Sequence, residues 1–337
     1  MKILLLEYIT GGGMRQEPMP ASLAVEGAQM LRALADDLLA LPSPPGVELI
    51  ILHDDRLPAP CFGVPGSIQL VNIRADDTFR SVWRKWIGHC DAAWPIAPET
   101  GGILEQLCLD VEVAGVPLLT SPAAAVRVAA SKLATARRLG LSALPVAHTL
   151  ALAEWRPRAG RPFVIKPDDG AGCEGVRIIH DPARSPMPGS MQGWIAQDLL
   201  NGEPLSLSAL FAQGRARLLS GNRQRIEPRG DGFILKACRV NAFADADGRW
   251  QALAEAVARA LPELWGYAGI DLILTAEGPV ILEINPRLTA SYAGLRLATG
   301  ENPAGWVLDL WKTGQLPGLR KHAGQPVDIL LEPNGEL

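Results

Sequence analysis

Cysteine is scarce in this chain of 337 residues, and the five cysteines form no recognisable pattern. They are scattered, odd in number and without a CxxC pair, so neither a disulfide framework nor a zinc site is expected. No apolar run approaches the roughly 20 residues that span a bilayer. The N-terminus meets an acid at Glu7, too early for a signal peptide. These absences favour a chain that works in the reducing cytoplasm.

Charge is also sparse, because charged residues make up 20% of the chain against 48% hydrophobic residues, and the net charge is −4. This weakly acidic balance argues against nucleic acid or an anionic membrane as the main partner. Seven basic residues are lysines and twenty-five are arginines, so a lysine in a conspicuous place carries some extra information. The five histidines show no ligand spacing, and Cys173 is expected to be a small filler rather than a nucleophile.

Short apolar runs alternate with helical patterns over the first 120 residues. Strands that alternate with helices imply parallel βαβ units, so a parallel α/β domain is predicted. The three glycines at 11–13 do not form GxGxxG, and a flexible turn is favoured over a dinucleotide site. Strands are predicted at 2–9, 47–54, 91–98 and 115–121, and helices at 22–40 and 102–115.

The rest of the chain has an α+β pattern with antiparallel signals. A helix is predicted over 123–140, capped by Ser121, and four short strand patterns follow it. An antiparallel hairpin is predicted over 204–226 and an amphipathic helix over 250–264. The Pro- and Gly-rich loop at 181–193 is expected to lie at a subdomain seam. The predicted domains are 1–120, 121–195 and 196–337.

Two apolar runs flank a short turn in the stretch GYAGIDLILTAEGPVILEINPR near the C-terminus, and each run carries one carboxylate, Asp271 or Glu283. A three-residue loop at 276–278 would place Asp271 opposite Glu283 on paired strands, where like charges repel. Asn285 lies two residues beyond Glu283 and therefore on the same face. Such a cluster of hard oxygens suits Mg²⁺ or Mn²⁺. A solvated strand face with chance acids is the alternative, and Arg287, whose guanidinium suits phosphate oxygens, favours the metal site.

Lys166 ends an apolar strand pattern and precedes a glycine-rich stretch, PDDGAGCEG. Gly170, Gly172 and Gly175 allow a loop whose N–H groups converge on an anion, although it is not the P-loop. Taken alone, an ordinary turn with an exposed lysine is favoured over a phosphate site. Lys132, in the helix predicted at 123–140, is expected on its own to face solvent.

The stretch AQDLLNGEP carries the candidates for nucleoside recognition. Backbone groups at 197–200 could read an adenine edge and Glu203 could bind a ribose hydroxyl, but a plain strand and turn is favoured in isolation. Arg223 and Arg225 alternate, so they share one strand face. They are phosphate ligands if that face points inward and a solvated pair if it points outward.

The order of these motifs resembles that of the ATP-grasp superfamily of carboxylate–amine ligases. It runs from Lys132 through Lys166 and its glycine loop, AQDLLNGE and GYAGIDLIL to ILEINPR, over about residues 120–315. The most specific part is the pair GxxGxD and ExNPR. The resemblance implies an ATP-grasp fold, with the first 120 residues as the preceding α/β domain, a small central α+β subdomain and a C-terminal antiparallel α+β subdomain.

The resemblance also implies a nucleotide site for ATP, a metal site and a catalytic set. The family more often has Glu where Asp198 stands and a second acid where Pro204 stands, so the ribose contact departs from the pattern. By matching position, the nucleotide residues are Lys132, Lys166, Gly170, Gly172, Gln197, Asp198, Leu199, Leu200 and Glu203, the metal ligands are Asp271, Glu283 and Asn285, and the catalytic residues are Arg287, Lys166 and Arg225.

Within the superfamily, KILLLEYITGGG, PIAPETGGIL and KPDDGAGCEGV are most similar to the tyramine–glutamate ligases of methanofuran biosynthesis. That similarity implies that ATP phosphorylates the γ-carboxylate of glutamate and that the amine of tyramine then attacks. The alternatives are another amino-acid ligase, of the D-Ala–D-Ala or peptide-forming kind, and a nucleotide-binding regulatory protein without turnover. The expected partners are small molecules, and a homodimer is left open.

The residues that contact the second substrate are the hardest to predict. Glu99 lies where a strand of the first domain is expected to end, the edge at which open parallel sheets bind ligands. It could contact the amine, and a plain acid at a helix start is the alternative. Trp94 and Tyr292 could flank an aromatic amine, although packing roles are favoured for both.

Overall fold

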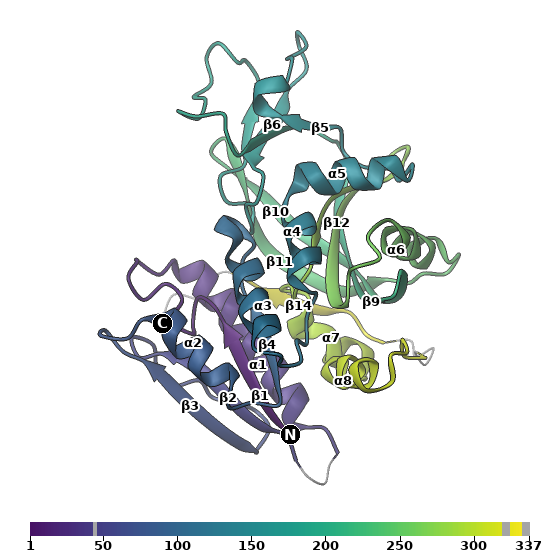
Figure 1. Cartoon of the computed structure of the whole chain (residues 1–337). Coiled ribbons are helices and arrows are strands. Elements are labelled where there is room, and N and C mark those ends of the chain that lie inside the picture. Colours follow the sequence, from purple (N-terminus) through teal and green to yellow (C-terminus); the bar gives the residue numbers. More distant parts are fainter. Residues whose placement is uncertain (43–45, 319–323, 332–337) are drawn as a thin grey trace.

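The computed structural model describes residues 1–42, 46–318 and 324–331, which form three sheets in succession along the chain (Figure 1). The first sheet is parallel and the other two are antiparallel. The predicted arrangement, a parallel α/β part followed by antiparallel α+β parts, is confirmed. No helix in these residue ranges is both long and apolar enough to cross a bilayer.

The first sheet has the strand order β3-β2-β1-β4, with buried apolar runs in three of its strands. The strand β3 and the helix α2 were not predicted, because β3 is largely part-exposed and its apolar pattern is weak. The strand predicted at 115–121 is wrong: only Leu118 forms a bridge, to Ala93, since Pro117 has no N–H with which to extend a ladder. The elements are β1 (Lys2–Glu7), α1 (Ala21–Leu39), β2 (Glu48–Asp54), β3 (Ser67–Ile73), α2 (Phe79–Ile87), β4 (Ala92–Ile96) and α3 (Ile103–Val113).

The single helix predicted over 123–140 is wrong, because the chain forms two helices there, α4 (Ala123–Ala130) and α5 (Lys132–Leu141). Ser131 between them has extended backbone angles, φ −83° and ψ 112°, and its hydroxyl accepts a hydrogen bond from the α5 backbone. Ser121, the predicted cap, instead donates to the carbonyl oxygen of Trp265. The break places Lys132 in the first turn of α5, where its side chain is buried.

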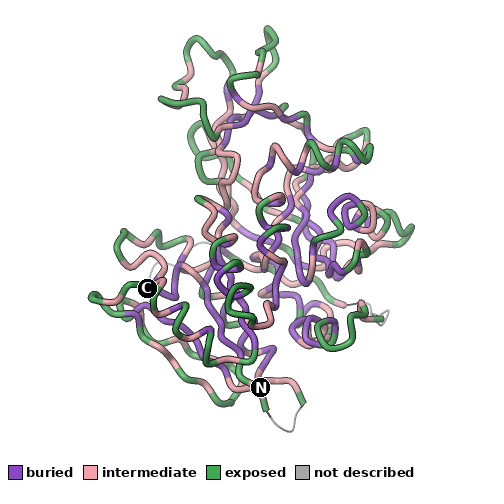
Figure 2. Tube along the Cα trace, in the orientation of Figure 1, coloured by how far each residue is buried: buried purple, intermediate pink, exposed green. Residues whose placement is uncertain are grey.

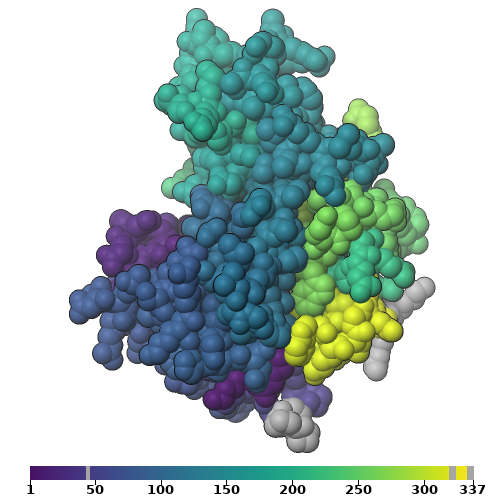
Figure 3. Space-filling model, viewed as in Figure 1, coloured from purple at the N-terminus to yellow at the C-terminus, as the bar shows by residue number. Residues whose placement is uncertain are grey.

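The second sheet has the order β5-β8-β6-β7 and forms a lobe that projects from the rest of the molecule (Figure 3). The residues of its connecting loops are mostly exposed, and its strands enclose a small core (Figure 2). The loop at 181–193 joins β7 to β8 within this sheet, so it is not a subdomain seam. The boundary predicted at 195 falls inside β8, and we propose that it lies after Asp198. The strands are β5 (Thr149–Ala151), β6 (Phe163–Pro167), β7 (Arg177–Ile179) and β8 (Trp194–Asp198).

The third sheet has the order β13-β12-β9-β10-β11-β14 and includes both predicted hairpins. The helix α6 packs on β9 and β10, while α1 of the first domain packs against α7 and α8. The first and third sheets therefore share one apolar core. The elements are β9 (Glu203–Ala212), β10 (Arg215–Arg229), β11 (Gly232–Phe243), α6 (Arg249–Ala260), β12 (Gly266–Thr275), β13 (Gly278–Asn285), α7 (Tyr292–Thr299), α8 (Pro303–Thr313) and β14 (Val327–Leu330).

The hairpin of β12 and β13 has the predicted pairing of Asp271 with Glu283, but it reaches that pairing by another route. Its turn has two residues rather than three, since Thr275 pairs with Gly278. That turn alone would shift the register by one residue. A bulge at Leu282 restores it, because Leu272 pairs with Ile281 while Asp271 pairs with Glu283.

Candidate active site

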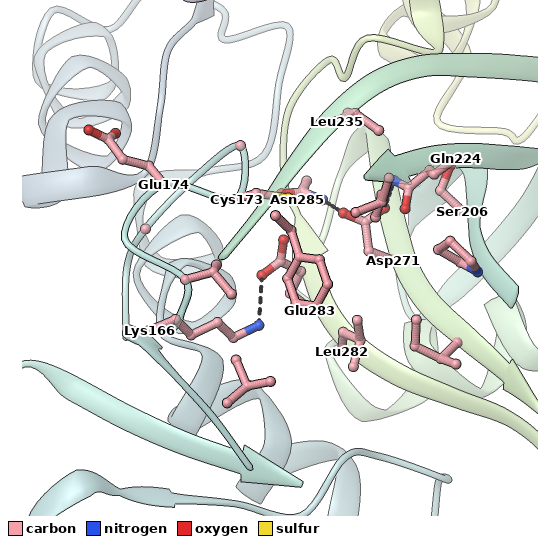
Figure 4. A pocket seen from close by; sticks show the side chains of 18 of the residues that line it. Lys166, Cys173, Glu174, Ser206, Gln224, Leu235, Asp271, Leu282, Glu283 and Asn285 are labelled. Atoms are coloured by element: carbon pink, nitrogen blue, oxygen red, sulfur yellow. Dashed lines mark hydrogen bonds and ion pairs between the residues drawn. The ribbon is translucent and has the colours of Figure 1, made fainter. Parts of the chain in front are cut away.

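A cavity of about 400 Å³ lies between the second and third sheets (Figure 4). Strands of both sheets, the glycine-rich loop after β6 and the segment after β13 supply its lining. Most of the residues predicted from the sequence lie here together. The cavity is lined by Lys132, Lys166, Gly170, Gly172, Gln197, Asp198, Leu199, Leu200, Asp271, Glu283, Asn285 and Arg287.

Two predicted residues, Arg225 and Glu203, are not part of this lining. On β10 it is Gln224 that faces the cavity, so the alternation of strand side chains turns Arg225 to the other face. The Arg225 side chain is 60% exposed and pairs with Glu227 at 3.3 Å. Glu203 pairs with Arg223 at 2.6 Å, and both are about half exposed. The structure therefore corrects the inward placement of Arg225 and of the Glu203 carboxylate.

The hairpin of β12 and β13 holds Asp271, Glu283 and Asn285 on one face, close together at one end of the cavity (Figure 4). Asp271 accepts hydrogen bonds from Asn285 at 2.9 Å and from Gln224 at 3.0 Å. Burial and the adjacent Glu283 charge raise the pKa of Asp271. No group of three or more His, Cys, Asp or Glu side chains that could hold a metal gathers anywhere in the described ranges. At the hairpin the metal candidates are two carboxylates and one amide.

Two buried lysines face Glu283, Lys132 from the start of α5 and Lys166 from β6. The Nζ of Lys132 lies 3.2 Å and the Nζ of Lys166 lies 3.7 Å from the same carboxylate oxygen, Oε2. Burial alone would raise the pKa of Glu283, but these ammonium groups hold it below its usual value. Burial in turn lowers the pKa of Lys166, against the opposing effect of Glu283. The prediction that Lys132 faces solvent is wrong, because α5 begins at this residue and turns it inward.

The glycine-rich loop is held against the start of α5. Asp168 accepts hydrogen bonds from the Ser131 hydroxyl at 2.6 Å and from the Leu133 N–H at 2.8 Å, so it anchors the start of α5. Gly172 and Cys173 have positive φ values of 63° and 65°, a conformation that favours glycine. Burial raises the pKa of Cys173 to about 12, so its thiol stays protonated and cannot serve as a nucleophile near neutral pH.

Arg287 is tied to the first domain through Glu99. Its Nε and Nη2 donate to the two carboxylate oxygens of Glu99 at 3.0 and 2.9 Å, and the side chains are only 11% and 5% exposed. The second Nη donates to the backbone oxygen of Leu288. Glu99, predicted as a contact for the amine, therefore orients Arg287 in this structure. Trp94 and Tyr292 are buried in the core, which confirms their packing roles.

Among the lining residues that the sequence analysis did not predict, two bear on the chemistry of the site. Gln224 lies between two arginines, and only the strand parity of β10 shows that it faces Asp271. Glu26 lies in the second turn of α1, and its side chain lines the cavity from the first domain. The signal available in the sequence was a glutamate within the mostly apolar helical stretch SLAVEGAQM.

The sequence of this chain is similar to those of known protein families and enzymes. Residues 129–291 match the family model of the ATP-grasp domain, and residues 47–126 match that of the pre-ATP-grasp 3 domain. A tyramine–L-glutamate ligase of Methanocaldococcus fervens is 27% identical over 87% of this chain and 89% of that protein. One of Methanocaldococcus jannaschii is 26% identical over 68% of this chain and 67% of that protein.

Solved structures show the same fold. An ATP-grasp superfamily protein of Archaeoglobus fulgidus superposes with a TM-score of 0.69 at 24% identity, over 98% of this chain and 100% of that one. An L-amino acid ligase of Bacillus licheniformis gives 0.60 at 18% identity, over 92% of this chain and 73% of that one. These likenesses show the fold. The two family models, which together match most of the chain, show that it belongs to the ATP-grasp family.

Proposed function

We propose that this protein is an ATP-dependent ligase that joins a carboxylate to an amine through an acyl phosphate, with release of ADP and phosphate. The observation that carries the proposal is the buried end of the cavity, where Asp271 and Glu283 face the ammonium groups of Lys132 and Lys166 beside Arg287. A carboxylate is a poor electrophile, and phosphorylation supplies a leaving group. The enzyme has to position the reactants and neutralise the transferred phosphoryl group.

The donor set of the hairpin fits a divalent cation. Asp271 and Glu283 are paired across two strands in a buried place, where two like charges are unfavourable without a cation. With Asn285 they offer the hard oxygens that Mg²⁺ or Mn²⁺ prefers. When bound there, the metal would neutralise charge on the phosphates of ATP. Asp271, Glu283 and Asn285 would hold the metal, and the ammonium groups of Lys132 and Lys166 would be placed to contact phosphate oxygens.

We assign the binding of the other parts of the nucleotide to the remaining residues of the lining. Leu199 and Leu200 lie beside an apolar part of the cavity, which suits a flat adenine, and the backbone at 197–200 offers groups for its edge. The loop at 168–175 would close over the phosphates and exclude water from the acyl phosphate. Arg287, held in orientation by Glu99, would contact the transferred phosphoryl group. Neither Glu203 nor Arg225 is needed for these roles.

For the substrates, we propose the γ-carboxylate of glutamate and tyramine or a related aromatic amine. The names of the two Methanocaldococcus relatives support this choice. The test is to measure ADP release with ATP, Mg²⁺, glutamate and a panel of amines and amino acids, and to weigh the product by mass spectrometry. A glutamyl-tyramine product supports the proposal. Turnover with an amino-acid acceptor alone would support the wider ligase reading instead, and no ADP release with any pair would overturn both.

A further inference from the structure

The first domain contributes one described residue, Glu26, to the lining of the cavity. Glu26 lies in the second turn of α1, a helix held between the first sheet and the helices α7 and α8. The next residue, Gly27, fixes this position closely, because a Cβ there would come within 2.4 Å of the buried carboxylate of Glu7. The close packing of α1 therefore fixes the position from which Glu26 faces the cavity.

Glu26 differs from Asp271 and Glu283 in having no side-chain partner. Among the described residues it forms no hydrogen bond and no ion pair, although its side chain is only partly exposed. Asp271 accepts two hydrogen bonds and Glu283 faces two lysines. Arg287 contributes compensating charge to Glu26, but its guanidinium is already engaged in the bidentate pair with Glu99. A carboxylate removed from water without a partner is unfavourable, so the site lacks one cation.

We infer that Glu26 receives the ammonium group of a substrate and thereby selects cationic molecules for the ligase site. This inference rests on the proposed function and adds a residue that determines specificity. An ammonium group has three donors and one positive charge, which is the complement of a lone carboxylate in a cavity wall. The ammonium has two sources, the α-ammonium of an amino-acid carboxylate donor and the protonated amine of the acceptor. A metal is a poorer occupant, because one carboxylate offers too few ligands.

The test compares each cationic ligand with an uncharged analogue in the full-length protein with Mg²⁺ and a non-hydrolysable ATP analogue. Calorimetry measures glutamate against glutarate, which lacks the α-ammonium, and tyramine against tyrosol, in which a hydroxyl replaces the amine. In the wild type we expect one cationic member to bind about 10- to 100-fold more tightly than its analogue, as for a hydrogen bond to a charged group. The isosteric variant Glu26→Gln should abolish that difference, and the pair in which it disappears identifies the source.

The matched control is Glu17→Gln, which removes a carboxylate of the same chain region from an exposed position outside the lining. It should keep the wild-type preference. Equal binding of both members in the wild type, or an unchanged preference in Glu26→Gln, would overturn the inference. Ligase turnover without any Glu26-dependent preference would refute only this assignment. A preference lost in Glu26→Gln without ADP release in the wild type would refute only the proposed function.

Discussion

The hairpin wall of the cavity (Asp271, Glu283 and Asn285) and its α1 wall (Glu26, with Glu7 behind it) hold their carboxylates in opposite ways. On the hairpin wall each acid has neighbours that compensate it, and Glu283 faces two ammonium groups. On the α1 wall no ammonium or guanidinium among the described residues pairs with either glutamate. Burial raises the pKa of Glu7 to about 7, although hydrogen bonds from Ile9 and Thr10 oppose the shift.

On the hairpin wall, the ammonium groups of Lys132 and Lys166 balance the charge of Glu283 without any ligand. On the α1 wall, Glu26 has no such partner, so a cation that arrives with a substrate would stabilise its charge. The four predictions that follow test this comparison, from the largest expected effect to the smallest.

The largest effect is expected from Glu283→Gln. This change removes the charge that faces both lysines and that would help to hold the proposed metal. We expect the rate of ADP release to fall about a thousandfold, since a preorganised charge at the transferred phosphoryl group is lost. The control Glu277→Gln changes an exposed acid in the turn of the same hairpin and should keep the wild-type rate. Retention of more than about a tenth of the activity in Glu283→Gln, in a protein that remains folded, would contradict the role of this wall.

The α1 wall makes a prediction about stability and pH through Glu7. Its pKa is about 7 in the folded chain against an ordinary value of 4.5, so between these values the native state holds a proton that the unfolded chain has released. The free energy of unfolding therefore falls as pH rises from about 4.5 to 7, by about 2–3 kcal/mol from this group. Urea denaturation of wild type and Glu7→Gln across this range measures the effect. The wild type should lose stability more steeply, and parallel curves would contradict the prediction.

The pair of Glu99 and Arg287 joins the first domain to the hairpin side, and Glu99→Gln tests whether it orients the arginine. Glutamine keeps one acceptor oxygen but loses the charge and the bidentate geometry. We expect kcat to fall about tenfold while KM for ATP stays within about twofold, because Glu99 acts through Arg287 and not on the nucleotide. The control is Glu105→Gln, which lies outside the cavity lining and pairs with Arg127, whose side chain is 69% exposed, so this pair should contribute little. A raised KM for ATP with normal kcat would show another role.

The hairpin of β12 and β13 could be predicted from the sequence because its strands are apolar and its acids fall at fixed spacings. The pairing of Asp271 with Glu283 came out correctly for an incomplete reason. The turn has two residues and the bulge at Leu282 compensates, and neither device has a strong signature in TAEGPVIL. The alternation of side chains along a strand predicts that the acids share one face. The turn length and the bulge, which set the pairing of the two strands, depend on tertiary packing.

The lysine at 132 and the glutamate at 26 show what local patterns could not predict. Lys132 looked solvent-exposed in an uninterrupted helix, and its burial depends on a break at Ser131 that Asp168 stabilises from a distant loop. Glu26 looked like one polar residue of an amphipathic helix, and its place in the cavity depends on how the first domain packs on the third sheet. Both side chains acquire their role through contacts between segments far apart in the chain.

The smallest effect is expected at Arg225, whose side chain lies on the face of β10 away from the cavity although the sequence resemblance implied a catalytic role for it. Arg225→Ala should leave ADP release within about twofold of wild type, because the side chain is 60% exposed on the face away from the cavity. Its neighbour Gln224 donates to Asp271 on the cavity face, so Gln224→Ala should lower activity by about tenfold through loss of that hydrogen bond. Steady-state assays of the two variants compare adjacent residues on one strand. A larger loss in Arg225→Ala than in Gln224→Ala would place the arginine at the reacting phosphate and reverse the assignment of the two faces of β10.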